Sequence, residues 1–292
     1  CEGLKARIGI DRAKGTYPGY YYMRKRLGEF IEWQFKTKDI AFGQLSEQFI
    51  HDYQNFVMDV KGLAVDTVRH YLAILKKVCR IAYKEGYAER CFFANFTLPQ
   101  KTERTPRALS REDFEKIRDV EIPAWRTTHI LVRDLFLFAC YTGTAYADAV
   151  SVTRDNLYTD DEGCLWLKYR RQKNELRASV KLLPEALALI EKYHDENRPT
   201  LFPMIYHPNL RRHMKSLAVL AGVSSTLCYH QARHSFASLI TLEAGVPIET
   251  ISRMLGHSDI TTTQVYARVT PKKLFEDMDR YIEATKDLKL IL

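Results

Sequence analysis

Residues 230–239, HQARHSFASL, place a histidine three positions before an arginine at the start of an apolar stretch. Residues three apart are neighbours on one face of a helix, so His230 and Arg233 are expected side by side at the edge of a core. A proton donor next to a fixed positive charge suits a phosphate group that undergoes displacement. The next residue, His234, is expected to point elsewhere on the helix, and we interpret it as structural.

The sequence around this stretch predicts a domain of helices with one β-hairpin. Residues 130–142 are typical of a buried helix that ends near Gly143. Residues 164–170 and 177–183 predict two strands, which the polar turn RQKNE joins. Further helices are expected at 184–194, 209–221, 230–244 and 247–256.

The amino-terminal part predicts a separate helical bundle. From Thr16 to about Ala88, apolar residues recur at helical spacing. Residues 95–109, NFTLPQKTERTPRAL, contain two prolines and no apolar periodicity, which is typical of a linker. Ser110 and Asp113 then form a capping-box pattern at the start of a helix. The expected domains are residues 1–94, of which about the first 15 are linker, and residues 110–292.

The composition favours a two-domain protein with a polyanionic partner. The 292 residues are 46 % hydrophobic, and 44 Lys+Arg exceed 36 Asp+Glu to give a formal charge of +8. The six cysteines show no zinc spacing and indicate a reducing compartment, and no apolar run reaches the ~18 residues of a membrane span. Cations also interrupt the apolar stripes of the first bundle, at Arg24, Lys25, Arg26, Lys76, Lys77 and Arg80.

Five residues of the second domain fall into one order along the chain. Lys173 lies on the hairpin turn, His230 and Arg233 share a helix, His257 follows in GHS, and Tyr266 lies in TTTQVYARV. His257 comes 24 residues after Arg233, and Tyr266 nine residues after His257. In this order and spacing the chain resembles the tyrosine recombinases, the integrase family, and most closely the integrases of prophages and conjugative transposons. The resemblance covers nearly the whole chain.

The resemblance implies a fold, a reaction and residue roles. The fold is mainly α with a small antiparallel sheet, in which a SAM-like core-binding domain precedes the catalytic domain. The reaction is site-specific integration or excision of a mobile element through a 3′-phosphotyrosyl bond, without metal or cofactor. Tyr266 would be the nucleophile and Arg233 a phosphate clamp. By the same resemblance, His230 would be a general base or donor, His257 a phosphate donor and Lys173 the acid.

One position departs from the family pattern. The family carries an arginine in a motif resembling TG-x-R-x-x-E/D, whereas residues 142–148 read TGTAYAD and place Ala145 there. Losing one oxyanion donor typically costs roughly 10²- to 10³-fold in rate. Several recombinases of conjugative transposons also lack this residue. We expect Arg170, Arg171 or a donor from the neighbouring domain to replace it in part.

The resemblance also implies partners. Double-stranded DNA would be gripped between the two domains by a homotetramer, with accessory DNA-bending or directionality proteins and no membrane, in the prokaryotic cytoplasm at the nucleoid. The apolar stripe of Leu274, Phe275, Met278 and Ile282 is expected to dock on a neighbouring protomer. The alternative is that this helix folds back on its own domain. The target sequence, and whether an arm-binding domain precedes Cys1, stay open.

Two other functions stay open at this point. A catalytically impaired DNA-binding protein acting at recombination sites would explain Ala145, although such a protein has no use for Tyr266. A type IB topoisomerase shares the chemistry, but it would relax DNA without a partner site. Exchange between two specific duplexes distinguishes the recombinase from both.

Overall fold

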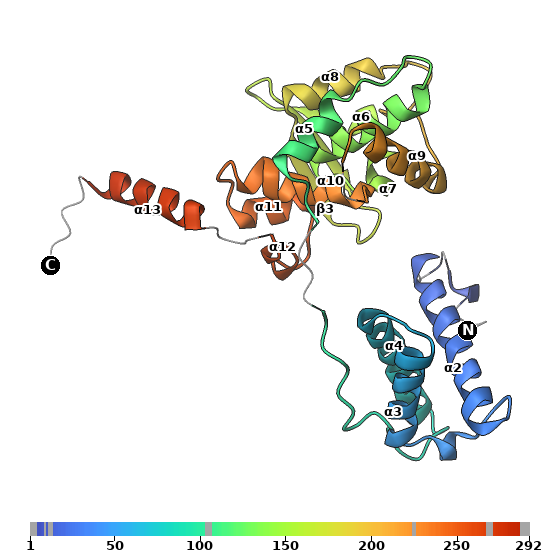
Figure 1. Ribbon diagram of the computed structural model, residues 1–292. Coiled ribbons are helices and arrows are strands. Elements are labelled where there is room, and N and C mark those ends of the chain that lie inside the picture. The colour runs from blue at the N-terminus through green and yellow to red at the C-terminus, as the bar shows by residue number, and fades with distance from the viewer. Residues whose placement is uncertain are drawn as a thin grey trace. The chain divides into compact units, whose positions relative to one another are not determined.

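The chain forms two compact units in the computed structural model, residues 1–104 and residues 105–292 (Figure 1). The structure describes residues 5–8, 10, 14–102, 107–223, 226–266 and 271–286, without the side chains of 14, 271–274, 276 and 284. Within these residues the elements are mainly helices with one small antiparallel sheet, which confirms the predicted fold class. No helix among the described residues is long and apolar enough to cross a membrane.

The first unit is a helical bundle around an aromatic core. Phe30 is fully buried, and its ring lies 5.1 Å from Phe49 and 5.6 Å from Tyr53. These rings come from two different helices, so the apolar stripes of the sequence meet at one point. The helices are α2 (Tyr17–Phe35), α3 (Glu47–Asn55), which continues as a π-helical segment (Phe56–Val60), and α4 (Val65–Lys84).

Part of the basic character of this unit is used internally. Arg26 forms an ion pair with Glu29 at 2.7 Å, and Lys76 Nζ donates to the Phe96 carbonyl at 3.2 Å. The remaining cations of the predicted set are exposed and are available to a polyanion. These are Arg24, Lys25, Lys77 and Arg80.

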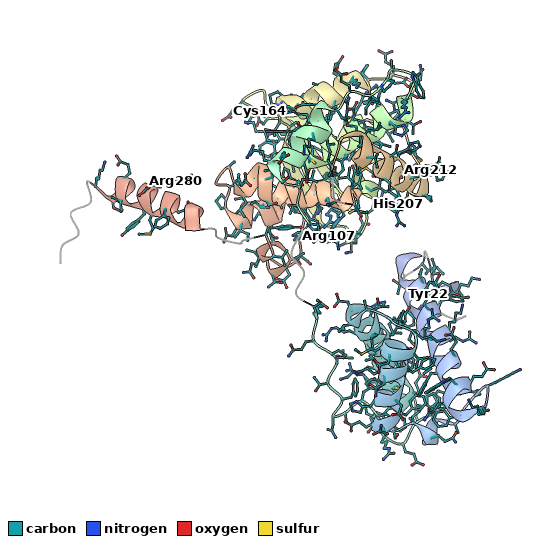
Figure 2. All side chains as sticks on the ribbon, in the orientation of Figure 1. Tyr22, Arg107, Cys164, His207, Arg212 and Arg280 are labelled. Carbon is teal, nitrogen blue, oxygen red and sulfur yellow. The ribbon has the colours of Figure 1, made fainter. Side chains whose placement is uncertain are left out.

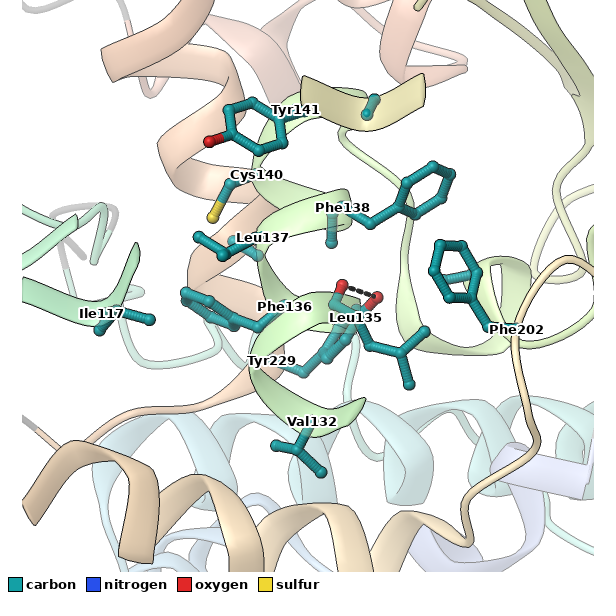
Figure 3. Packing of buried hydrophobic residues seen from close by; sticks show 14 of the residues in the cluster. Ile117, Val132, Leu135, Phe136, Leu137, Phe138, Cys140, Tyr141, Phe202 and Tyr229 are labelled. Carbon is teal, nitrogen blue, oxygen red and sulfur yellow. Dashed lines mark hydrogen bonds between the residues drawn. The ribbon is translucent and has the colours of Figure 1, made fainter. Parts of the chain in front are cut away.

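The second unit is built around one buried helix, α6. Five other helices of the described residues, α5, α7, α8, α9 and α10, pack around it. Figure 3 shows its apolar side chains pointing in several directions into the core, with Tyr229 Oη donating to the Leu135 carbonyl at 3.1 Å. The helices of the unit are α5 (Arg111–Asp119), α6 (Thr127–Thr142), α7 (Tyr146–Ala149), α8 (Pro184–Lys192), α9 (His207–Leu220), α10 (Tyr229–Ser235), α11 (Ile248–Leu255), α12 (Thr261–Gln264) and α13 (Pro271–Thr285).

The sheet contains the predicted hairpin and one further strand. β2 (Leu165–Arg170) and β3 (Arg177–Lys181) pair antiparallel, so the hairpin is confirmed. β1 (Leu157–Thr159) adds to the other edge of β2. Three residues are too few to show a period-2 pattern, which is why the sequence did not reveal β1. β3 packs against α11 and thereby sets the hairpin turn beside the end of that helix.

The single helix expected at 230–244 was wrong in its backbone geometry. α10 ends at Ser235, and residues 236–242 continue as a π-helical segment. The Ser238 hydroxyl donates to a carbonyl four residues back at 2.7 Å, and Thr241 Oγ1 donates to carbonyls four and five residues back at 2.9 Å. Such hydroxyl bonds compete with the regular backbone ladder, so the turn widens here.

Candidate active site

Arg233 is the most deeply buried of the predicted site residues, with 1 % of its surface exposed. Nη1 donates to the Gly143 carbonyl at 2.6 Å, and Nη2 donates to the Leu255 carbonyl at 2.5 Å. These carbonyls stand at the ends of α6 and α11, where the helix dipole is negative and stabilises a cation. Burial, followed by the charge of Arg171, lowers the pKa of Arg233 to about 10, which leaves it protonated at neutral pH.

Gly143 fixes the end of α6 against its neighbours. Its φ of 69° is left-handed, and an added Cβ would lie 2.6 Å from the Phe236 ring and 2.8 Å from Leu255. Only glycine meets both conditions without strain. The predicted helix stop is confirmed, and it aims a free carbonyl at Arg233.

His257 bridges Arg233 and α12. Its Nε2 lies 3.0 Å from Arg233 Nη2, and its Nδ1 lies 2.7 Å from Thr263 Oγ1. Because the guanidinium can only donate, Nε2 accepts, and the proton of a neutral ring is assigned to Nδ1. Burial and the nearby Arg233 lower the pKa of His257 to about 4, so the ring is neutral at pH 7.

Tyr266 carries its hydroxyl into the same region and is only 8 % exposed. Its Oη lies 2.8 Å from His234 Nδ1. Burial raises the pKa of Tyr266, while the charges of Arg233 and Arg171 act in the opposite direction. The hydroxyl is therefore protonated at neutral pH and hydrogen-bonded to an imidazole.

The interpretation of His234 as a residue that points elsewhere was wrong. The expectation used only the spacing along one helix, on which His230 and Arg233 share a face. Tyr266 arrives from a segment 32 residues further along the chain and approaches the adjacent face of α10. No pattern within the sequence reveals such a contact, because it depends on where α12 is placed.

His230 and Lys173 lie at the open side of the site. The His230 ring is exposed and meets the His234 ring edge to face, with centroids 4.5 Å apart. Partial burial and the charges of Arg233 and Lys173 lower the pKa of His230. The Lys173 charge also lowers the pKa of His257. Lys173 itself is exposed on the turn between β2 and β3.

Arg171 is buried near Asp148 of the TGTAYAD motif, whereas Arg170 is exposed on β2. Arg171 Nη1 donates to the Gly256 carbonyl at 3.1 Å, and Nε lies 3.8 Å from an Asp148 carboxylate oxygen. Nε is buried and has no hydrogen-bond partner among the described residues. A buried donor with spare capacity, next to Arg233, is suited to an incoming anion.

The hairpin turn is also hydrogen-bonded to Asp148 and to the Gly256 carbonyl. Gln172 N donates to Asp148 Oδ1 at 2.9 Å, and Asn174 Nδ2 lies 3.4 Å from the Gly256 carbonyl. Gly256 is left-handed at φ 59°, and an added Cβ would lie 2.8 Å from the Arg171 side chain. Asp148 and Gly256 thus place both Arg171 and the turn that carries Lys173.

A row of basic residues on α9 continues outward from the site. His207, Arg211 and Lys215 are exposed and spaced by four residues, so they share one helix face. They line a hollow of about 320 Å³ that also contacts His230. Figure 2 shows His207 and Arg212 on the outside of this helix. A polyanion in the hollow would meet positive charge on one side and the histidine on the other.

Comparisons with known proteins identify relatives of the chain. Residues 107–273 match the family model described as phage integrase family, and residues 4–98 match the phage integrase SAM-like domain. The chain is 24 % identical to tyrosine recombinase XerD of Chlorobaculum tepidum over 83 % of each chain. It is 26 % identical to tyrosine recombinase XerD of Brucella melitensis over 74 % of this chain and 76 % of the relative.

Solved structures show the same fold. A lambda integrase dimer bound to a core site superposes with a TM-score of 0.71 at 16 % identity, covering 92 % of this chain and 93 % of the other. The Tn1549 transposon integrase in complex with a circular intermediate DNA gives a TM-score of 0.69 at 16 % identity, covering 95 % and 97 %.

Proposed function

The chain belongs to the phage integrase family, and we propose that it integrates or excises a mobile element by site-specific recombination between two duplexes. It is a DNA breaking and rejoining enzyme of the tyrosine recombinase type, which works through a phosphotyrosine intermediate. One observation carries the proposal for this chain. The Tyr266 hydroxyl and the buried Arg233 guanidinium are held in one site with His257, and the Lys173 turn lies at its rim.

In the proposed reaction Tyr266 Oη attacks the scissile phosphorus, and the bond from phosphorus to the 5′ oxygen breaks. Lys173 gives a proton to the departing 5′ oxygen. Arg233 stabilises the negative charge that develops on the nonbridging oxygens. A bound phosphate raises the pKa of nearby imidazoles, which favours donation from His257 and His230. The reverse steps with a second 5′ hydroxyl rejoin the strand.

Arg171 is the proposed replacement for the arginine missing at Ala145. It is buried beside Arg233 and held by Asp148, a residue of the same TGTAYAD motif. Its charge, which lies close enough to Arg233 to lower the pKa of that residue, supports a role in stabilising a nonbridging oxygen. Arg170 is exposed at the end of β2, and it lacks this placement. An active site with Arg171 in it also weakens the alternative of a catalytically impaired DNA binder.

Double-stranded DNA is the proposed partner, gripped by the exposed cations of both units. The row of His207, Arg211 and Lys215 would contact phosphates beside the scissile one. Each neutralised phosphate predicts a fall of about 0.9 in log K per decade of salt. Nucleoid DNA in the bacterial cytoplasm is the proposed location of this activity.

A homotetramer with α13 docked in trans is the proposed assembly on DNA, assisted by DNA-bending or directionality proteins. The described part of the predicted stripe, Phe275, Met278 and Ile282, is exposed, so these side chains are free to bury against another surface. Light scattering on cognate DNA with a chain ending at Pro271 tests the docking. A tetramer of unchanged stability would contradict it.

A covalent-trapping assay tests the function. A nicked suicide substrate with the element's end sequence is incubated with the wild-type protein, with Tyr266→Phe and with Tyr158→Phe as a matched control, because Tyr158 is exposed on β1. We expect an adduct that survives denaturation with the wild type and the control, and none with Tyr266→Phe. Binding to a verified cognate site without any adduct would favour the catalytically impaired DNA binder instead.

A further inference from the structure

We propose that His234 is the base that accepts the proton of Tyr266 when the tyrosine attacks DNA. The inference rests on the proposed function and adds a catalytic group to it. His234 Nδ1 lies 2.8 Å from Tyr266 Oη, within hydrogen-bond distance of the atom that must become the nucleophile. His230 is the other histidine of α10 at the site, but it contacts the His234 ring rather than the tyrosine.

The proposal uses one tautomer of the pair. With the ring proton on Nε2, His234 Nδ1 is unprotonated and accepts the hydrogen bond from the Tyr266 hydroxyl, and we assign this tautomer. The charged and titratable groups that face His234 are His230 and Arg233 on α10 and Tyr266 after α12. Burial and the first two of these lower the pKa of His234 to about 4, so the ring is neutral and able to accept at pH 7.

The position of the ring in the fold supports a functional contact. His234 is half-buried, and its backbone carbonyl accepts the Ser238 hydroxyl at 2.7 Å at the point where α10 gives way to the π-helical segment. Such π-helical insertions are frequent at functional sites. The His234 ring lies between the rings of His230 and Tyr266. The centroids of the His234 and Tyr266 rings are 5.4 Å apart.

The proposed step balances in both directions. In cleavage the proton moves from Tyr266 Oη to His234 Nδ1, the bond from Oη to phosphorus forms and the bond to the 5′ oxygen breaks. The negative phosphate then lies beside the imidazolium of His234. Its charge raises the pKa of the ring during the step and so favours proton acceptance. In rejoining, the bond from phosphorus to Oη breaks, and His234 returns the proton to the tyrosine.

Two substitutions separate proton acceptance from positioning. His234→Asn keeps an oxygen acceptor near the place of Nδ1 but takes no proton at neutral pH, whereas His234→Ala removes both. His194→Asn, at an exposed histidine outside the site, is the control. Single-turnover adduct formation is measured from pH 5.5 to 9, together with DNA affinity and thermal unfolding to verify that each variant folds and binds.

A second substrate separates this proton from that of the leaving group. When sulfur replaces the bridging 5′ oxygen, the thiolate departs without a proton, so the defect of Lys173→Met should vanish. We expect His234→Asn to be slower than the wild type by about 10²- to 10⁴-fold at pH 7 on both substrates, with the deficit shrinking as pH rises and hydroxide takes over. His234→Ala should be at least as slow.

Three results would overturn the proposal. A rate for His234→Asn close to the wild type would show that His234 only positions the hydroxyl. If the substrate with bridging sulfur restores the rate of His234→Asn, His234 acts on the proton of the leaving group and not on that of the tyrosine. Faster adduct formation than in the wild type, in either variant, would mean that the hydrogen bond with His234 lowers the reactivity of the tyrosine. If Tyr266→Phe itself still forms the adduct, the proposed function fails, and that failure is distinct from these three.

Discussion

Two cations of the site are held in opposite ways. Arg233 is buried, and its guanidinium donates to the carbonyls that end α6 and α11, whereas Lys173 is exposed on the hairpin turn. An arginine keeps its proton at any physiological pH and suits a fixed charge, whereas a lysine can release one. The difference teaches that the group proposed to stabilise charge is preorganised by the fold, and the proposed proton donor is brought by a loop.

Arg233→Ala should give the largest effect, because it damages both the fold and the reaction. Two helix-end carbonyls would lose their donor, at a cost of about 2–4 kcal/mol in the free energy of unfolding. Loss of a central oxyanion donor should also slow adduct formation by about 10³-fold or more. Chemical denaturation and the suicide substrate measure the two, with the exposed Arg253→Ala as control. A variant as stable as the wild type would contradict the anchoring role.

Lys173→Met should separate catalysis from folding. The side chain is exposed, so the free energy of unfolding should change by less than about 0.5 kcal/mol. Removing the general acid should slow cleavage by about 10²- to 10⁴-fold on the ordinary substrate. Lys168→Met, on the exposed face of β2, is the control. A large loss of stability would show that the turn lysine is structural after all.

Arg171 is the intermediate case, a buried cation on the loop side of the site. Arg171→Ala should slow cleavage by about 10²- to 10³-fold, whereas Arg170→Ala should have little effect. Ala145→Arg should raise the wild-type rate only a few fold and should partly rescue Arg171→Ala. Adduct formation on the same suicide substrate measures the three single variants and the Ala145→Arg, Arg171→Ala double variant against the wild type. A gain of a thousandfold from Ala145→Arg alone would show that nothing replaces the missing arginine.

The buried imidazoles predict the smallest effect, a loss of stability in acid. The pKa values of His234 and His257 are about 4 in the folded chain, below the ordinary 6.5 of the unfolded one. Below pH 6.5 the unfolded chain binds more protons, so stability falls as the pH drops from about 6.5 to 4. The loss is on the order of 1 kcal/mol for each ring, because both rings are only partly buried and solvent screens part of the shift. Scanning calorimetry over this range measures the loss. His257→Asn should flatten it, and an unchanged slope in that variant would contradict the assignment.

Much of the fold followed from local patterns. Cys79 and Cys140 sit in helical apolar stripes and are buried as expected, and Gly143 ends its helix with a left-handed φ. Ser110 accepts from Asp113 N at 3.0 Å, so the predicted start of α5 is confirmed. Spacing, capping and chirality act within a few residues, and the sequence therefore displays them directly.

For the site, too, local features were predictable from the sequence and long-range contacts were not. The residue types at Lys173, His230, Arg233, His257 and Tyr266 are legible in order and spacing, and the structure brings them into one region of the second unit. The hydrogen bonds and charge interactions among these residues cannot be predicted from the sequence. The choice of Arg171 over Arg170 depends on which side of β2 faces Asp148, and the contact of His234 with Tyr266 depends on the placement of α12.

By itself, the sequence determined the two helical units, the hairpin, the family and the list of chemically active side chains. Only the tertiary structure decided that two helix ends hold Arg233, that a buried Arg171 lies near Asp148 and that His234 meets the tyrosine hydroxyl. The physical reason is one of range. Periodicity and capping are properties of neighbouring residues, whereas burial, pKa and donor geometry arise from segments that meet only after the chain has folded.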